Sequence, residues 1–333
     1  MWKKILLVLV LILILAVAGG AAFLYLHQPA QAAPSTIKVA MTPERIARGK
    51  FIFENLSDCD GCHSQHDFTR FDAPIVASGR GRGNVMSSIV QGLPGTVVAP
   101  NVTPDPETGI GKWTDGEKIR AIREGVDNTG RALFPMMPYP NFKNMSDEDV
   151  QSVVAYMNSL PPVKNPLPVT KLDFPVGLFI KFVPAPVAGP VAPPNRGDQL
   201  KYGEYLVTVG GCSDCHTPLE KGQPVVAKTL AGGREFITPY GTVRSANITP
   251  DQETGIGKWT EDFFRKKFYD YREYAASGPP PLSGPQAFTL MPWLSLSQLP
   301  PEDLGAIYAW LHTVKPVHNY VEMHPGVPNP TTP

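Results

Sequence analysis

The chain has 333 residues, with 30 basic and 30 acidic side chains and no net charge. Residues 36–160 carry 13 basic and 15 acidic side chains, and residues 196–333 carry 12 and 14. Two mildly acidic halves exclude the basic surface that a nucleic-acid-binding protein needs, so we expect no nucleic-acid partner. The length is sufficient for two domains of ordinary size.

An uncharged apolar run opens the chain. Ile5 to Leu26 form 22 residues without a charge, preceded by Lys3 and Lys4, and about 20 apolar residues suffice to span a bilayer as a helix. Because lysines before a first span favour the cytoplasm, we expect the rest of the chain on the periplasmic side of a bacterial inner membrane. A cleaved signal peptide is the alternative, since residues 30–32 are Ala-Gln-Ala, although the run exceeds the roughly 7–15 apolar residues of such peptides.

A helix is predicted from Thr42 or Pro43 to Phe53, directly before the first of two Cys-x-x-Cys-His pentapeptides. Two thiols three positions apart can each add to a vinyl group of one porphyrin, and the following histidine can bind its iron. Two copies without a spare cysteine predict two covalently bound c-type haems. The thioether cysteines are Cys59, Cys62, Cys212 and Cys215, and the axial histidines are His63 and His216.

Four cysteines could instead bind zinc or form disulfides. A shared zinc site would need two segments about 150 residues apart to converge, and it would leave His63 and His216 unexplained. Disulfides between cysteines three residues apart would close strained loops, and nothing in the chain resembles a thioredoxin fold. The haem interpretation is therefore preferred.

The chain contains one unit twice. Residues 101–114 recur as residues 247–260 with 12 of 14 positions identical, and outside this block equivalent positions lie about 154 residues apart, as with Gly49 and Gly203. Each unit is expected to end in a helix, from Ser146 to Leu160 and from Pro300 to Leu311. The glycines let the first helix approach this last helix closely, and the crossing is expected to enclose the cofactor.

The second axial ligand of each iron is predicted from the same repeat. Met137 and Met291 follow their histidines by 74 and 75 residues, and both precede a proline and an aromatic residue. Met136 aligns with Leu290, which cannot bind iron, so the repeat favours Met137. Met/His coordination saturates the iron and raises its reduction potential, which predicts electron transfer rather than oxygen or peroxide chemistry.

Other matched polar residues are candidate contacts to the haem propionates. Arg80 and Arg234 could neutralise propionate charge, although ordinary surface arginine is the alternative. The repeated block adds candidates on segments whose composition is typical of turns: Asn101, Thr103, Asn247 and Thr249. Four histidines have no counterpart in the other unit and are expected to be surface or hydrogen-bonded polar residues: His66, His312, His318 and His324.

Residues 161–195 contain ten prolines and indicate an extended, semi-rigid linker. Its centre, residues 174–182, is too apolar for a solvated linker. Two interpretations stay open, namely packing along the two haem domains and contact with the membrane or a partner subunit. The Pro-rich tail from Pro325 is expected to be disordered.

The Asn-x-Thr-Pro-Asp-x-x-Thr-Gly-Ile-Gly-x-Trp block, placed between Cys-x-x-Cys-His and Met-Pro-Tyr, resembles the cytochrome c subunits of bacterial membrane-bound alcohol, aldehyde and gluconate dehydrogenases. The likeness covers about residues 42–320. It implies passage of electrons from a periplasmic dehydrogenase to quinone or to a downstream oxidase. Such subunits commonly have three haem sites, whereas this chain has two and carries its apolar run at the amino terminus.

We therefore expect an all-α protein of two tandem class I cytochrome c domains after a single N-terminal transmembrane helix. Its parts are an anchor and tether at 1–35, domains at 36–160 and 196–333, and a linker at 161–195. The expected function is single-electron relay by a protein that is not itself an enzyme, with a dehydrogenase subunit as redox partner. A subunit that donates electrons to a respiratory complex or terminal oxidase is one alternative, and a dihaem peroxidase or thiosulfate dehydrogenase is another.

Overall fold

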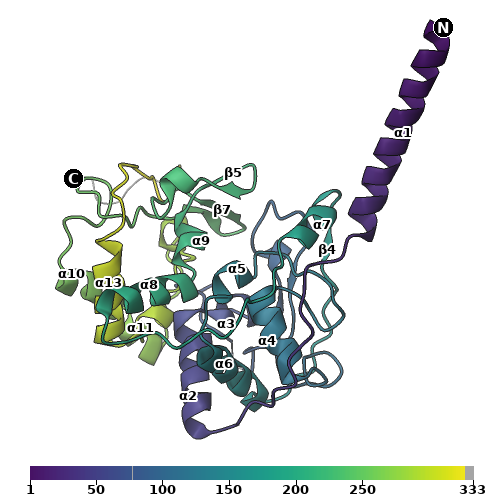
Figure 1. Ribbon diagram of the computed structural model, residues 1–333. Helices are drawn as coiled ribbons and strands as arrows, with labels where there is room; N and C mark the ends of the chain where they lie inside the picture. The colour runs from purple at the N-terminus through teal and green to yellow at the C-terminus, as the bar shows by residue number, and fades with distance from the viewer. Residues whose placement is uncertain (77, 327–333) are drawn as a thin grey trace.

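The computed structural model describes residues 1–76 and 78–326. Helix α1 (Trp2–Leu26) projects away from the rest of the chain (Figure 1), and none of its residues is buried. Within the described residues it is the one helix long and apolar enough to cross a membrane, with a mean hydropathy of 3.1. The predicted disordered tail lies outside the described residues from position 327 onward.

Two crossing helices organise the first half. Helix α2 (Pro43–Phe51) is capped by Thr42 and continues as a π-helical turn (Ile52–Leu56). It packs against α6 (Asp147–Ser159), whose cap is Ser146. Gly49 lies at the crossing, where a Cβ atom would come within 1.8 Å of the Ser152 carbonyl oxygen. These observations confirm both predicted helices and the close approach at the glycine.

The second half repeats this crossing. Helix α8 (Gln199–Val209) packs against α13 (Pro301–Leu311). A Cβ atom on Gly203 would lie 2.0 Å from the Ala306 carbonyl oxygen. The two halves therefore use the same helix pair in the same way.

Each half has a third helix that was not predicted, directly after the repeated block. These helices are α4 (Asp115–Glu124) and α10 (Glu261–Tyr269), capped by Thr114 and Thr260. Shorter helices complete the set: α3 (Cys59–His63), α5 (Tyr139–Phe142), α7 (Val176–Phe179), α9 (Cys212–His216), α11 (Arg272–Ser277) and α12 (Trp293–Leu296). Single 3-10 turns lie at Met86–Ser88, Ile180–Phe182, Val226–Lys228 and Pro285–Ala287.

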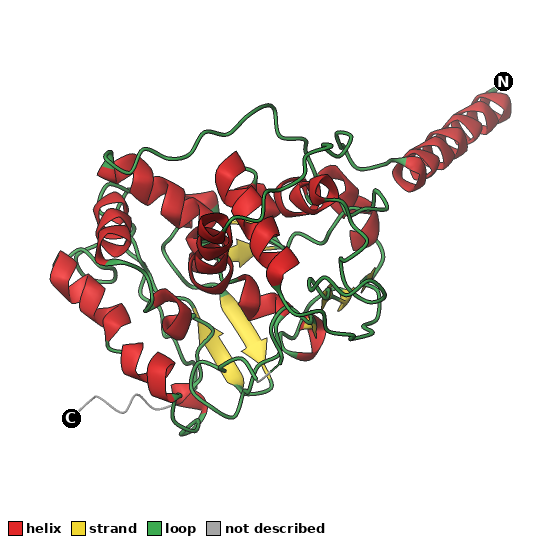
Figure 2. Cartoon of the chain, turned by 90° about the horizontal axis from the view of Figure 1, so that it is seen from below, coloured by secondary structure: helices red, strands yellow, loops and turns green. Residues whose placement is uncertain are grey.

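The predominantly helical fold also contains short antiparallel strand pairs, which the all-α prediction lacked (Figure 2). Among the described residues there are four such two-stranded sheets. They pair β1 (Asn84–Val85) with β3 (Val98–Ala99), β2 (Gly95–Thr96) with β4 (Lys171–Leu172), β5 (Leu219–Glu220) with β6 (Gln223–Pro224), and β7 (Glu235–Thr238) with β8 (Gly241–Arg244). They shape loops and build no extended sheet in the part of the chain that is described.

The start of the linker packs on the first half. The backbone N–H of Val163 donates to Thr103 Oγ1 at 3.1 Å, and that of Asn165 donates to Thr108 Oγ1 at 2.9 Å. In the second half, the N–H groups of Val317 and Asn319 make the same bonds to Thr249 and Thr254. In each half, the last helix is therefore followed by an extended segment that is bound to the repeated block of the same half. Residues 161–165 thus behave as part of the first unit.

The two halves share one hydrophobic core and polar contacts. Ser57 Oγ donates to the Val209 carbonyl oxygen at 3.0 Å, and Asn141 Nδ2 donates to Asp214 Oδ2 at 2.7 Å. The Tyr205 hydroxyl donates to Asp149 Oδ2 at 2.6 Å. These bonds bring the two Cys-x-x-Cys-His turns together at the centre of the molecule.

Candidate cofactor site

A cavity of about 1900 Å³ lies between the halves and contains both pentapeptides. Pockets for single small ligands usually enclose about 300–1,000 Å³. The walls are largely apolar and come from both halves, including Phe53, Ile122, Phe264 and Ile307. The cavity is therefore large enough for more than one planar apolar cofactor.

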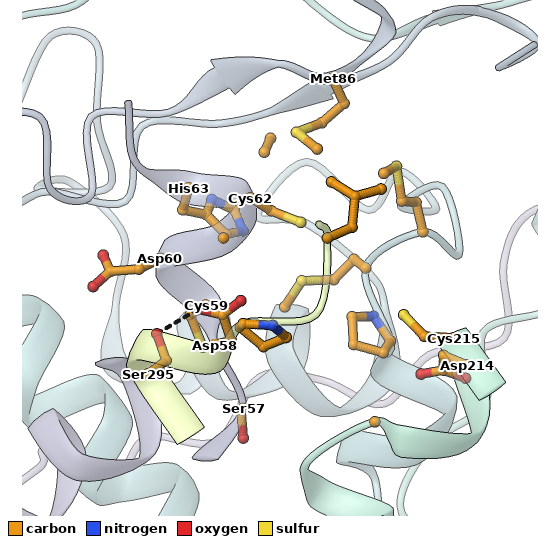
Figure 3. A pocket seen from close by; sticks show the side chains of 18 of the residues that line it. Ser57, Asp58, Cys59, Asp60, Cys62, His63, Met86, Asp214, Cys215 and Ser295 are labelled. Carbon is orange, nitrogen blue, oxygen red and sulfur yellow. Dashed lines mark hydrogen bonds between the residues drawn. The ribbon is translucent and has the colours of Figure 1, made fainter. Parts of the chain in front are cut away.

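Each pentapeptide forms one helical turn behind a left-handed residue. Asp58 (φ 42°) precedes α3, and Gly211 (φ 65°) precedes α9. Aspartate and glycine are among the residues that most readily adopt this conformation. In a helical turn, residues i and i+3 share a face, so both cysteines of each turn face the cavity. Figure 3 shows Cys59, Cys62 and His63 on one side, with Cys215 across from them.

The two histidines are held in the same way. His63 Nδ1 lies 2.8 Å from the Pro100 carbonyl oxygen, and His216 Nδ1 lies 2.7 Å from that of Ala246. This bond places the proton on Nδ1 and leaves Nε2 available as a metal ligand. Burial also lowers the pKa of both imidazoles, which favours the neutral form that binds iron. A backbone carbonyl group therefore orients each ring.

These carbonyl groups belong to the residue directly before each repeated block, and side chains of the block fix its conformation. Asn101 Oδ1 accepts from the backbone N–H and hydroxyl of Thr103, while its Nδ2 donates to Thr108 Oγ1 and the Val163 carbonyl oxygen. Asn247 makes the same four bonds, with Thr249, Thr254 and Val317.

Asn101, Thr103, Asn247 and Thr249 are all buried, and their hydrogen bonds are made within the chain. They fix the conformation of the segment directly after the carbonyl group that orients each histidine. The propionate contacts that the sequence suggested stay a prediction for these four residues.

The two matched arginines line the cavity with different partners. Arg80 pairs with Glu54 at 3.0 Å and with Asp60 at 2.9 Å. Arg234 donates to the Asp214 carbonyl oxygen, and its guanidinium lies 5.2 Å from the centre of the Phe236 ring. Both cations are at the cavity wall, so a propionate contact stays a prediction for both.

Met137 and Met291 also line the cavity, on equivalent turns. In each half the N–H two residues later, of Tyr139 or Trp293, donates to the methionine carbonyl oxygen at 2.8 Å. Met136 and Met86 line the same cavity, so a position in the cavity wall does not by itself identify the iron ligand. Ligation by Met137 and Met291 stays a prediction that rests on the repeat.

The unmatched histidine His66 is accounted for by backbone contacts. Its Nδ1 lies 2.6 Å from the Ala73 carbonyl oxygen, and its Nε2 lies 2.9 Å from that of Asp60. Both ring nitrogens are therefore engaged, as expected for a hydrogen-bonded polar residue. Within the described residues, no group of three or more His, Cys, Asp or Glu side chains could hold a further metal ion.

Two cavity carboxyl groups were not predicted. Asp58 accepts a bond from Ser295 Oγ at 3.3 Å, and Asp72 accepts one from the Leu294 N–H at 2.6 Å. Burial raises the pKa of Asp72 to about 7. Burial, together with repulsion from Asp72, raises the pKa of Asp58 well above its usual value. Through their hydrogen bonds to Ser295 and Leu294, the two carboxyl groups join the first half to helix α12 of the second half.

We expect Asp72→Asn to weaken the pH dependence of folding. The folded-state pKa of about 7 exceeds the value of about 3.9 for an unfolded aspartate, so the folded state retains a proton between these pH values. Stability from this group is fully present below about pH 4 and is lost as the pH rises through 7, by at most about 1.4 kcal/mol per pH unit.

Urea unfolding followed by circular dichroism between pH 4 and 8 measures this effect. The variant keeps an amide oxygen that can accept the Leu294 N–H, so its stability should fall less than that of the wild type. Asp262→Asn changes a carboxylate that is 97% exposed and is the control. Equal pH dependence in the wild type and Asp72→Asn would contradict the assignment.

Comparison with known proteins agrees with these features. Residues 46–161 match the cytochrome c family. The chain is 31% identical over 309 residues to a diheme cytochrome c-type protein of Cereibacter sphaeroides, covering 89% of this chain and 94% of that protein.

Two dehydrogenase subunits are also similar. The chain is 33% identical over 232 residues to the cytochrome c subunit of the quinone alcohol dehydrogenase of Gluconobacter oxydans, covering 65% of this chain and 45% of that subunit. It is 31% identical over 296 residues to the fructose dehydrogenase cytochrome subunit of Gluconobacter japonicus, covering 86% and 55%. The chain spans about half the length of these subunits.

A cytochrome c domain implies covalently bound c-type haem, and the residues present fit that group. They provide paired cavity-facing thiols, neutral imidazoles with a free Nε2 and a large apolar cavity. Nearly full-length similarity to a protein of this kind adds to the local match. The chain therefore belongs to the cytochrome c family, with relatives among the cytochrome c subunits of alcohol and fructose dehydrogenases.

Proposed function

We propose that this protein relays single electrons through two covalently bound haems, from a dehydrogenase subunit towards the respiratory chain, in the periplasm of a bacterium. The observation that carries the proposal is that two Cys-x-x-Cys-His turns, each with its histidine bonded to an equivalent carbonyl, face one cavity. Haem supplies a one-electron couple when bound. The protein would attach it, orient its ligands and exclude water.

The proposal includes two tandem haem domains, at residues 36–160 and 196–333. The first set would comprise Cys59, Cys62, His63 and Met137, and the second Cys212, Cys215, His216 and Met291. Support comes from the matched helix crossings at Gly49 and Gly203. The extended segments that follow each last helix, with their matched bonds to the repeated blocks, add to it.

The approach of the two attachment turns supports electron passage between the sites. Cys59 and Cys62 of the first half line the same cavity as Cys212 and Cys215 of the second half. Cofactors attached there would share one cavity without an intervening wall of protein.

A membrane location and a dehydrogenase partner complete the proposal. Helix α1 has the length and composition of an anchor, and the two lysines before its apolar run favour a cytoplasmic amino terminus. Several relatives are named as cytochrome subunits of alcohol, fructose and gluconate dehydrogenases. The same kind of partner is therefore proposed here, and the respiratory chain or an oxidase would receive the electrons.

Removing one attachment site at a time tests the relay. We expect pyridine haemochrome assays to find two haems per wild-type chain, and one in each of Cys59→Ala/Cys62→Ala and Cys212→Ala/Cys215→Ala. A tagged chain is purified from solubilised membranes, and the dehydrogenase that copurifies with it is identified. The substrate of this dehydrogenase is then added to the membranes. Haem reduction should appear in the wild type, and onward transfer to the oxidase should fall to background in both variants.

Each variant has a matched control in which only one of the two thioether bonds is lost, Cys59→Ala or Cys212→Ala, so that the haem stays attached. These single variants should retain two haems and electron relay. Turnover of peroxide or thiosulfate by the purified wild-type chain alone would contradict the proposal and favour a dihaem enzyme.

A further inference from the structure

Residues 174–183 form an exposed hydrophobic surface in addition to that of α1. We call these residues the apolar segment. They include α7 and the 3-10 turn Ile180–Phe182, and Lys181 is their only charged residue. Four large apolar side chains are exposed within these ten residues: Phe174 at 79%, Phe179 at 54%, Phe182 at 46% and Val183 at 42%. Exposed apolar patches of this kind commonly mark contact with a membrane or a protein.

The apolar segment packs against the end of the apolar helix. The His27 ring stacks on Phe182 with centroids 4.1 Å apart, and the Phe23 ring lies 6.2 Å from Phe182. Lys181 Nζ donates to the Tyr25 carbonyl oxygen at 3.0 Å. Figure 1 shows α7 beside the end of α1 that joins the rest of the chain. These contacts set the height of the segment along the axis of α1.

If α1 spans the bilayer, this height corresponds to the periplasmic surface of the inner membrane. The 25 residues of α1 rise about 37 Å at 1.5 Å per residue, and the hydrocarbon core is about 30 Å thick. The last turn, with Phe23 and Tyr25, would then lie at the headgroup level, where aromatic side chains are favoured. The apolar segment lies beside this turn, and a lysine there can reach lipid phosphates.

We propose that the apolar segment is a second membrane contact, which inserts Phe174, Phe179 and Phe182 into the headgroup region of the periplasmic leaflet. This inference rests on the proposed anchoring by α1. A helix alone leaves the attached domains free to rotate and tilt, whereas a second contact beside it restricts their orientation. The cavity would then face its redox partners at a fixed angle to the membrane.

The bilayer is a better occupant than a protein because the surface is continuous with the apolar helix. Phe182 already contacts Phe23 and His27 of the membrane-proximal turn, so lipid around α1 would also reach the segment. The residues carry no acidic group that would oppose anionic lipid headgroups. A protein partner remains a distinguishable outcome of the test.

Spin labels on single introduced cysteines test the inference in the full holoprotein. All four native cysteines would be held as thioethers, so an added thiol is the reactive one. Phe179→Cys probes the segment, Leu13→Cys probes α1, and Val226→Cys probes a position that is 81% exposed in the second half. Each labelled protein is reconstituted into phosphatidylcholine–phosphatidylglycerol liposomes. The power saturation of each label's EPR signal is measured with oxygen and with a nickel chelate, and each value is compared with that of the same sample under nitrogen.

Labels at Leu13 and Phe179 should be relaxed mainly by oxygen, which concentrates in lipid, and the label at Val226 mainly by the nickel chelate. An aqueous Phe179 label beside a lipid-exposed Leu13 label would overturn the membrane contact and leave the anchor in place. Aqueous labels at both positions would overturn both. A Phe179 label that is aqueous in liposomes and protected only in native membranes would overturn the inference in favour of a protein partner.

Discussion

Gly49→Ala is expected to lower the free energy of unfolding by roughly 3 kcal/mol, at the upper end of the usual cost of overpacking a core. The added Cβ would lie 1.8 Å from the Ser152 carbonyl oxygen and 2.8 Å from the Cβ of Tyr156. A backbone carbonyl inside α6 cannot move aside without separating α2 from α6. This penalty exceeds the gain of about 1 kcal/mol that alanine offers over glycine within a helix.

Gly203→Ala tests the same contact in the second half. Its Cβ would lie 2.0 Å from the Ala306 carbonyl oxygen and 2.8 Å from the Cβ of Trp310, so we expect a similar loss. Gly177→Ala in α7 is the control, because the nearest atom, the Cβ of Leu172, is 3.8 Å away. Urea unfolding followed by circular dichroism measures all three. A Gly49 variant as stable as the control would show that α2 and α6 do not cross as described.

The helices that cross at these glycines could be predicted because their signals are local. Thr42 and Ser146 cap their helices with side-chain oxygens, and the buried faces recur at helical spacing. Helix α4 lacks such a stripe. It buries Lys118, Arg120 and Arg123, whose partners come from distant parts of the sequence, such as Asn158 for Lys118. Its capping box at Thr114 and Glu117 was the available signal.

The same distinction between local signals and distant contacts applies to the residues of the candidate site. Thiols and imidazoles were predictable because the chemistry of haem attachment requires fixed spacing, and the repeat showed each one twice. The carbonyls of Pro100 and Ala246 were not, since a backbone acceptor leaves no trace in side-chain identity. Asp72 depends on a contact to Leu294, 222 residues away. Asp58 corresponds to Gly211 in the second half, so comparison of the repeats gave no reason to select it.

Met137→Ala and Met291→Ala are each expected to lower the reduction potential of one haem by on the order of 0.1–0.3 V, within the range of about 0.8 V over which axial ligands set haem potentials. A thioether favours the reduced iron, so its loss stabilises the oxidised form. The sulfur-to-iron charge-transfer band of the oxidised protein should lose half its intensity in each variant and disappear in the double variant. Spectroelectrochemical titration measures both quantities.

Met136→Ala and Met86→Ala are matched controls, since both side chains line the same cavity. Met136 directly precedes the proposed ligand, and Met86 is only 5% exposed and packs in the smaller hydrophobic core. Loss of packing at these positions can reduce stability but should leave the charge-transfer band intact. A full band in Met137→Ala together with a half-intensity band in Met136→Ala would transfer the ligand role to Met136. The alignment of the two repeats would then be misleading at this position.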